Sequence, residues 1–166
     1  MNEKELGMLF CSFREGNNEA FSEIYNELKK PVFTIAYRIT FVREIAEDIT
    51  QELFLKLYTS PPDASVRNPR AWIFRMARNL AIDALRKKQC SDIDEVTLSF
   101  DDTERINTGI DIEKALSSLS LSEREIVSLH IDGGLGFREI GKALGISLTS
   151  AYRKYKSALN KLRRML

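Results

Sequence analysis

Two stretches of this chain concentrate side chains that bind polyanions. Between Arg67 and Gln89 seven residues are basic and only Asp83 is acidic. Between Ala151 and Leu166 six residues are basic and none is acidic. Ammonium and guanidinium groups neutralise phosphates, so clusters of this kind are typical of nucleic-acid binding. A solvated helix face would carry the same charges, and the charges by themselves do not decide between the two.

The first basic stretch also carries side chains that hydrogen-bond to bases. Asn68-Pro69 begins a helix, because the Asn side chain accepts from a free backbone N–H and proline fits the first helical position. The polar face of this helix combines arginines with Asn79 and Asp83. Amide and carboxylate groups bind base edges, whereas a carboxylate repels phosphate. This composition predicts a groove for exposed bases of single-stranded DNA; the alternative is a surface ion pair from Asp83 to a basic residue one turn on.

The second basic stretch follows a short glycine-containing turn. We expect a helix over Phe137–Leu144 that ends at Gly145, and a second helix that Ser147 caps and that reaches Leu166. Two helices joined in this way, the second of them basic, form a helix-turn-helix pattern. A glycine inside the first helix, Gly141, costs about 1 kcal/mol of helix propensity, which is expected if the second helix crosses there at close range.

The second helix of such a unit enters the major groove of duplex DNA with its first turns. The side chains placed to read bases there are Thr149, Ser150, Arg153 and Lys154. Lys156 is better suited to a phosphate, and phosphate contacts position a protein without specifying sequence.

A third surface is acidic. The spacing predicts a helix from Arg43 to Tyr58, whose outward face carries Glu44, Glu47, Asp48, Gln51 and Glu52. Phe54, Leu55 and Tyr58 are expected beside these residues, with Phe54 as an exposed aromatic side chain. An acidic rim around an exposed aromatic side chain predicts a protein partner and argues against DNA at this face.

Helical spacing dominates the sequence and alternating strand patterns are missing, which predicts an all-α fold. Pro31 is expected to end or kink the helix that begins at Asn18. After a short helix at Ile112–Ser118, Ser122 is expected to cap a helix over Glu123–Ile131, with Glu125 as its capping-box partner. We predict two small helical domains, residues 1–89 and 112–166, joined by an acidic linker at residues 90–111.

Composition excludes several classes of protein. The chain has 166 residues, 25 basic against 24 acidic, and its start lacks the basic and apolar segments of a signal peptide, so we expect a cytoplasmic protein. Cys11 and Cys90 lie far apart, which fits neither a disulfide framework nor a zinc site. His130 is the only histidine, and a single helical histidine is a weak candidate for a catalytic base. We predict no enzymatic activity, cofactor or metal.

Three motifs, in order and spacing, resemble those of a bacterial sigma factor of the extracytoplasmic-function group, the compact branch of the sigma-70 family. They are AEDITQELFLKLY (46–58), NPRAWIFRMARNLAIDALRKK (68–88) and LSLSEREIVSLHIDGGLGFREIGKALGIS (119–147). The resemblance covers Asn18 to Gln89 and Ile112 to Leu166. It implies that the first domain, region 2, binds the clamp helices of core RNA polymerase and captures the melted −10 element. The second, region 4, would sit on the polymerase flap and read the −35 element as duplex.

The resemblance assigns these tasks to particular residues. Polymerase binding falls on Asp48, Gln51, Glu52 and Phe54. Capture of −10 bases falls on the fourth helix and the loop before it, at Arg67, Asn68, Arg75, Arg78, Asn79, Asp83, Arg86 and Lys87. Reading of the −35 element falls on Ser147, Thr149, Ser150, Arg153, Lys154 and Lys156. The acidic linker matches the linker of the family, and an anti-sigma factor is an implied partner.

Two positions depart from the usual family pattern. Gly141 stands where the family usually has alanine, and Tyr152 stands where it usually has lysine. The rival interpretation is a stand-alone transcriptional regulator, whose helix-turn-helix binds duplex DNA without polymerase and whose N-terminal domain senses a ligand or dimerises.

Overall fold

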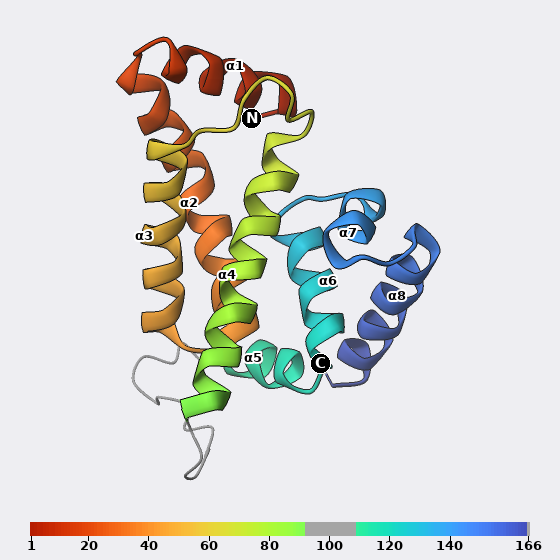
Figure 1. Cartoon of the computed structure of the whole chain (residues 1–166). Helices are drawn as coiled ribbons and strands as arrows, with labels where there is room; N and C mark the ends of the chain where they lie inside the picture. The colour runs from red at the N-terminus through yellow and green to blue at the C-terminus, as the bar shows by residue number, and fades with distance from the viewer. Residues whose placement is uncertain (92–108, 166) are drawn as a thin grey trace.

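The computed structural model describes residues 1–91 and 109–165. These residues form eight helices and no strand, which confirms the predicted all-α class. Helices α1 to α4 make a first lobe and α5 to α8 a second lobe (Figure 1). The predicted acidic linker, residues 90–111, lies almost entirely outside the described residues. None of the described helices is long and apolar enough to span a bilayer.

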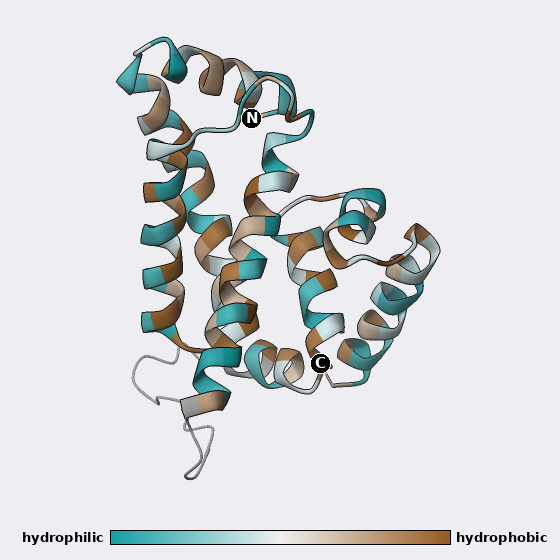
Figure 2. Cartoon of the chain, in the orientation of Figure 1, coloured by the Kyte–Doolittle hydropathy of each residue, from teal (hydrophilic) through white to brown (hydrophobic). Residues whose placement is uncertain are grey.

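The helices follow the predicted segments closely. The first lobe contains α1 (Glu3–Arg14), α2 (Asn18–Thr40), α3 (Arg43–Thr59) and α4 (Pro69–Ser91). The second lobe contains α5 (Gly109–Ser117), α6 (Leu121–Ile131), α7 (Phe137–Leu144) and α8 (Leu148–Met165). Hydrophilic and hydrophobic residues alternate along most helices (Figure 2), because each helix buries one face and exposes the other.

Helix α2 runs through Pro31, so of the two predicted outcomes, an end or a kink, the end is wrong. A proline inside a helix removes one backbone hydrogen bond and costs about 3 kcal/mol. Leu28, Val32 and Ile35, on either side of the proline, are all completely buried. Helix α2 packs against α1, α3, α4 and α6, and burial of these side chains from several sides outweighs the local penalty.

Helix α1 was not predicted from the sequence, although its signals are present. The Asn2 side chain accepts a hydrogen bond from the Glu5 N–H at 2.9 Å, and the Glu5 carboxylate accepts from the Asn2 N–H at 2.8 Å. This is a capping box. Leu6 and Phe10, four residues apart, are buried against the first lobe. The helix thereby closes the end of the lobe where α3 connects to α4.

The start of α6 also differs from the prediction. Its N-cap is Ser120, not Ser122, and Glu123 completes the capping box in place of Glu125. The Ser120 hydroxyl accepts from the Glu123 N–H at 3.3 Å, and the Glu123 carboxylate accepts from the Ser120 N–H at 3.0 Å. Both pairs have the same sequence spacing, so only the position of the helix start separates them.

The apolar core continues from the first lobe into the second. Ile126, Leu129, Leu135 and Ile140 of the second lobe are buried in one cluster with the core of the first. A smaller cluster in the second lobe contains Leu116, Leu119, Val127 and Ala158. Helix α6 packs against α2 on one side and against α8 on the other. It is therefore the element that joins the two lobes.

Candidate nucleic-acid and protein interfaces

One face of α4 is apolar and packs in the core, and the opposite, polar face is exposed to solvent. Ile73, Phe74, Ala77 and Ala81 are completely buried, and Trp72 is half-buried against the same core. On the opposite face the predicted −10 residues Arg75, Asn79, Asp83, Arg86 and Lys87 are all exposed.

The groups on this face interact weakly with one another. The Asp83 carboxylate lies 3.9 Å from the Arg86 guanidinium, and both side chains are exposed. An exposed pair at this distance contributes a few tenths of a kcal/mol. Both groups are consequently available to a ligand at little cost.

Arg78 differs from Arg75, Arg86 and Lys87, the other basic residues of α4 that were predicted to bind the −10 element. It is half-buried, and its Nε and Nη2 atoms both lie 2.9 Å from Oε1 of Glu125 on α6. Its Nη1 atom donates to the side-chain oxygen of Asn79 at 3.1 Å. The structure therefore uses Arg78 to join the two lobes.

The loop before α4 positions the remaining −10 residues. The Asn68 side-chain oxygen accepts from the Ala71 N–H at 2.8 Å, which confirms its predicted capping role. Arg67 beside it is exposed. Arg14 at the end of α1 donates to the carbonyl of Pro62, which ties the same loop to α1.

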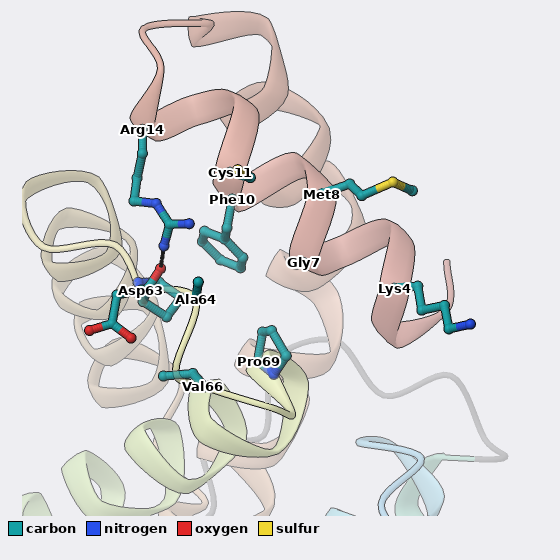
Figure 3. Close-up of a pocket in the computed structure, with 11 residues that line it drawn as sticks. Lys4, Gly7, Met8, Phe10, Cys11, Arg14, Asp63, Ala64, Val66 and Pro69 are labelled. Carbon is teal, nitrogen blue, oxygen red and sulfur yellow. Dashed lines mark hydrogen bonds between the residues drawn. The ribbon is translucent and has the colours of Figure 1, made fainter.

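An open cavity of about 460 Å³ lies between α1 and this loop (Figure 3). Its lining is largely apolar and comes from α1 and from residues 62–69. Lys4 and Arg14 lie at its edge on the α1 side. Arg67 and Asn68 belong to the same loop but lie outside the lining.

The acidic face of α3 is exposed as predicted at Asp48, Gln51 and Glu52. The expected exposure of Phe54 is wrong, because its side chain is only 5% exposed. Its ring packs on Tyr25 at 4.7 Å and on Phe21 at 6.4 Å between centroids. Phe54 thus belongs to the aromatic core under this face.

Leu55 and Tyr58, which were expected beside Phe54, supply the exposed apolar surface of this face. Their exposed fractions are 65% and 52%. Leu55 follows Asp48 by seven residues and Gln51 by four, so it shares their helix face. Leu55 and Tyr58 are thus exposed as expected, and only the expectation for Phe54 is wrong.

Helices α7 and α8 form the predicted helix-turn-helix. Gly145 adopts a left-handed φ of 67° at the end of α7, and the Ser147 hydroxyl accepts from the Ser150 N–H at 3.1 Å. A Cβ atom on Gly141 would lie 2.7 Å from the Ile146 carbonyl oxygen. The backbone thus approaches Gly141 closely, but the nearest atom belongs to the turn, and the first backbone nitrogen of α8, Leu148 N, lies 3.5 Å away.

Some of the predicted −35 residues are exposed, and others form hydrogen bonds within the second lobe. Thr149, Arg153 and Lys156 are exposed. Ser150 is half-buried and its hydroxyl accepts from that of Ser147 at 3.0 Å. Lys154 donates to the Ser122 hydroxyl of α6 at 2.8 Å. Tyr152, 45% exposed on the same helix, was not among the predicted residues.

Two glutamates of α6 have opposite electrostatic environments. Burial opposes ionisation of Glu123, but hydrogen bonds with Lys161, Ser120 and Ser157 outweigh it, and its pKa lies below the ordinary value. Burial raises the pKa of Glu125 despite the nearby Arg78. Burial likewise raises the pKa of Asp132, which pairs with Arg38 of α2 at 2.6 Å.

No group of three or more His, Cys, Asp and Glu side chains in the described residues is arranged to hold a metal ion. Cys11 and Cys90 are both free and exposed. His130 packs on Phe137 and Tyr155, and its Nδ1 atom lies 2.8 Å from the Leu135 carbonyl oxygen. It therefore supports the turn between α6 and α7.

Comparison with known proteins accounts for both lobes. The model of Sigma-70 region 2 matches residues 24–90, and the model of Sigma-70 region 4 matches residues 115–164. The ECF RNA polymerase sigma factor SigE of Mycolicibacterium smegmatis is 28% identical over 87% of this chain, which spans 60% of that relative's length. SigK of Mycobacterium ulcerans is 26% identical over 98% of this chain and 94% of the relative.

Solved structures share the fold. RpoE of Bartonella quintana, determined with the anti-sigma factor NepR, is 22% identical with a TM-score of 0.69, over 87% of this chain and 95% of that one. CnrH, determined with the cytosolic domain of CnrY, is 19% identical with a TM-score of 0.69, over 97% and 96%.

The chain therefore belongs to the sigma-70 family. Within that family it is a sigma factor of the extracytoplasmic-function group, as the three sequence motifs implied.

Proposed function

We propose that this sigma factor directs core RNA polymerase to specific promoters by three separate surfaces. The acidic face of α3 binds polymerase through Asp48, Gln51 and Glu52, with Leu55 and Tyr58 as its apolar contacts. The exposed face of α4 and the loop before it capture unpaired −10 bases. The exposed face of α8 reads the −35 duplex. The chain acts in the cytoplasm, by binding and not by catalysis.

The observation that carries this proposal is the exposed, acid-free face of α8 beside a tight turn. Gly141 lets the turn approach α7 closely, and the capped start of α8 projects from it. This is the geometry that places a helix in the major groove. The mixed polar face of α4 is different in kind, and it matches single-stranded DNA, whose base edges are accessible.

Binding to both promoter elements requires the lobes to separate. The −10 and −35 elements are centred about 25 base pairs apart, which is about 85 Å of duplex. A compact chain of this length has a radius of gyration of about 15 Å. We therefore propose that the packed arrangement is the free form, and that the ion pairs Arg78–Glu125 and Arg38–Asp132 break when polymerase binds.

Run-off transcription with purified core polymerase tests the function. With this chain as the only added factor, we expect initiation at discrete sites on genomic DNA fragments of the source organism. Tight binding to a duplex operator by the chain alone, without any stimulation of core polymerase, would favour the stand-alone regulator instead.

The α3 surface is tested by charge reversal. Asp48→Arg removes an acid from the exposed face and adds a base, so we expect co-purification with core polymerase to be lost. Glu23→Arg on α2 makes the same charge change at another exposed position and should leave binding intact. Retention of core binding by Asp48→Arg would contradict the assignment.

We also propose an anti-sigma protein as a partner, because RpoE, a sigma factor with the same fold, was determined with an anti-sigma factor. Affinity purification of the chain from its host, with Asp48→Arg as a variant that no longer retains polymerase, would test this. We expect one small additional protein that blocks run-off transcription when it is added back.

A further inference from the structure

The exposed face of α8 contains one aromatic side chain that neither the sequence prediction nor the family assignment uses. Thr149, Tyr152, Arg153 and Lys156 have the spacing of one helix face, and all four are exposed. Ala151 and Ala158, on the opposite face, are completely buried. Tyr152 therefore lies among the residues proposed to enter the major groove. Of these residues it is the one with an aromatic ring, which can make an apolar contact.

The ring of Tyr152 is held in place from one side. It packs edge-on against Phe137 at the start of α7, with 5.3 Å between centroids and an interplanar angle of 81°. Phe137 is itself stacked on His130 at 4.6 Å. The Lys156 ammonium lies 5.7 Å from the Tyr152 ring centroid on the same helix.

Because of this packing, the Tyr152 side chain should lose little conformational entropy when it binds DNA. Its side chain remains 45% exposed although one edge of the ring is fixed. Among the described residues no hydrogen bond to its hydroxyl is formed. A ring that is already oriented gives up little conformational entropy on binding, which favours its use in recognition.

The chemistry of the ring selects one feature of the major groove. Thymine is the base that presents a methyl group there, whereas the other groups on base edges are hydrogen-bond donors and acceptors. Lysine at this position would attract phosphate without regard to sequence. A neutral aromatic ring releases no counterion and gains most from an apolar contact.

We propose that Tyr152 reads the C5 methyl group of a thymine in the upstream promoter element. The proposal rests on the assignment of α8 to the −35 duplex. Arg153 beside it is suited to a guanine, and Lys156 to a phosphate. Tyr152 is thus a specificity-determining residue of this particular sigma factor, at a position where the family usually has a cation.

The test uses holoenzyme assembled from core polymerase and the full chain. Selection from a duplex library of randomised sequence, by wild type and by Tyr152→Phe, Tyr152→Ala and Lys156→Ala, gives the preferred upstream element of each. Each thymine of the wild-type element is then replaced singly by deoxyuridine, which removes only the methyl group. Circular dichroism melting checks that each variant is folded.

We expect one thymine whose replacement weakens wild-type binding about fourfold, the cost of losing one buried methyl contact. Tyr152→Phe should keep both the thymine preference and this loss, because the ring is retained. Tyr152→Ala should lose the preference at that position alone. Lys156→Ala should weaken binding to all sequences without changing the preferred element.

Two results would overturn the proposal, and they are distinguishable. If wild-type holoenzyme selects an upstream element but no thymine responds to deoxyuridine, Tyr152 does not read a methyl group, and the role of α8 stands. If wild-type holoenzyme selects no upstream element at all, the assignment of α8 fails and the inference fails with it. The deoxyuridine series on the wild type needs no variant to fold.

Discussion

Helix α6 makes two contacts that differ in how well they satisfy buried charge. Toward α8, the Glu123 carboxylate lies 2.8 Å from Lys161 and also accepts from Ser120 and Ser157. Toward α4, the Glu125 carboxylate, also buried, is bonded by Arg78. In the neighbourhood of the second contact Arg124 Nε and Ser128 Oγ are buried without a hydrogen-bond partner.

This difference indicates which of the two contacts remains when polymerase binds. A buried carboxylate with several donors is well compensated, whereas one held mainly by a single ion pair gains little over hydration. The α6–α8 contact therefore belongs to the permanent interior of the second lobe. The ion pairs Arg78–Glu125 and Arg38–Asp132 lie beside the apolar cluster that the two lobes share, and they are the contacts between the lobes that gain least from burial.

The largest expected effect comes from breaking the contact inside the second lobe. Glu123→Gln leaves Lys161 without its charge partner and disturbs the capping box of α6. We expect the free energy of unfolding to fall by about 2 kcal/mol, measured by urea denaturation of the full chain. Glu23→Gln, an exposed glutamate on α2, is the control and should change it by less than about 0.5 kcal/mol.

The contact between the lobes should respond in another way. Glu125→Gln removes the charge that holds Arg78, but Arg78 is only half-buried and can turn to water. We therefore expect a change in unfolding free energy below about 1 kcal/mol, together with a longer distance between the lobes. Energy transfer between dyes on Cys11 and on Asn160→Cys, in a Cys90→Ser background, measures that distance.

Equal losses of stability for Glu123→Gln and Glu125→Gln would contradict the difference proposed between the two contacts of α6. If Glu125→Gln lowers stability as much as Glu123→Gln and leaves energy transfer unchanged, the inter-lobe contact is as permanent as the interior. Asp132→Asn, which removes the neighbouring ion pair with Arg38, provides a second test of the same interface and should also lower the energy transfer.

The smallest expected effect is on the pH dependence of stability. The pKa of Glu123 is lowered in the folded chain, so its stabilisation is present above its unfolded value and is lost as pH falls through the folded pKa. The pKa of Glu125 is raised, so the folded chain takes up its proton first and gains stability as pH falls toward the unfolded value.

The two substitutions should therefore change the pH profile in opposite directions. Between about pH 7 and pH 4, Glu123→Gln should make the loss of stability with acid shallower, and Glu125→Gln should make it steeper. Urea denaturation across this range measures both slopes. Parallel profiles for the two variants would mean that the two carboxyls share one environment.

Most of the fold could be predicted from the sequence, because helix signals are local. The spacing of apolar residues in α3, the Asn68 cap of α4 and the Gly145 end of α7 all lie where they were expected. Apart from helix α1 and the end predicted at Pro31, the errors occur where the sequence offers two neighbouring residues for one role. Ser120 and Ser122 precede glutamates at the same spacing, and local chemistry does not distinguish them.

The candidate site was predicted less completely for a related reason. Phe54 and Leu55 are adjacent and both apolar, yet the tertiary structure buries the first and exposes the second. Residue type suggested the aromatic one, whereas the register of the helix on α2 decided the outcome. Tyr152 was noted only as a departure, since its packing on Phe137 joins residues from two helices.

The sequence by itself determined the helices, their order, the two basic faces and the family, because hydrophobic period, caps and motifs act over a few residues. The tertiary structure decided which charges face one another. Arg78 and Glu125 are 47 residues apart and are paired only because α6 packs on α2 and α7 on α4. Such contacts depend on how two helices are placed in space, and no local pattern encodes that placement.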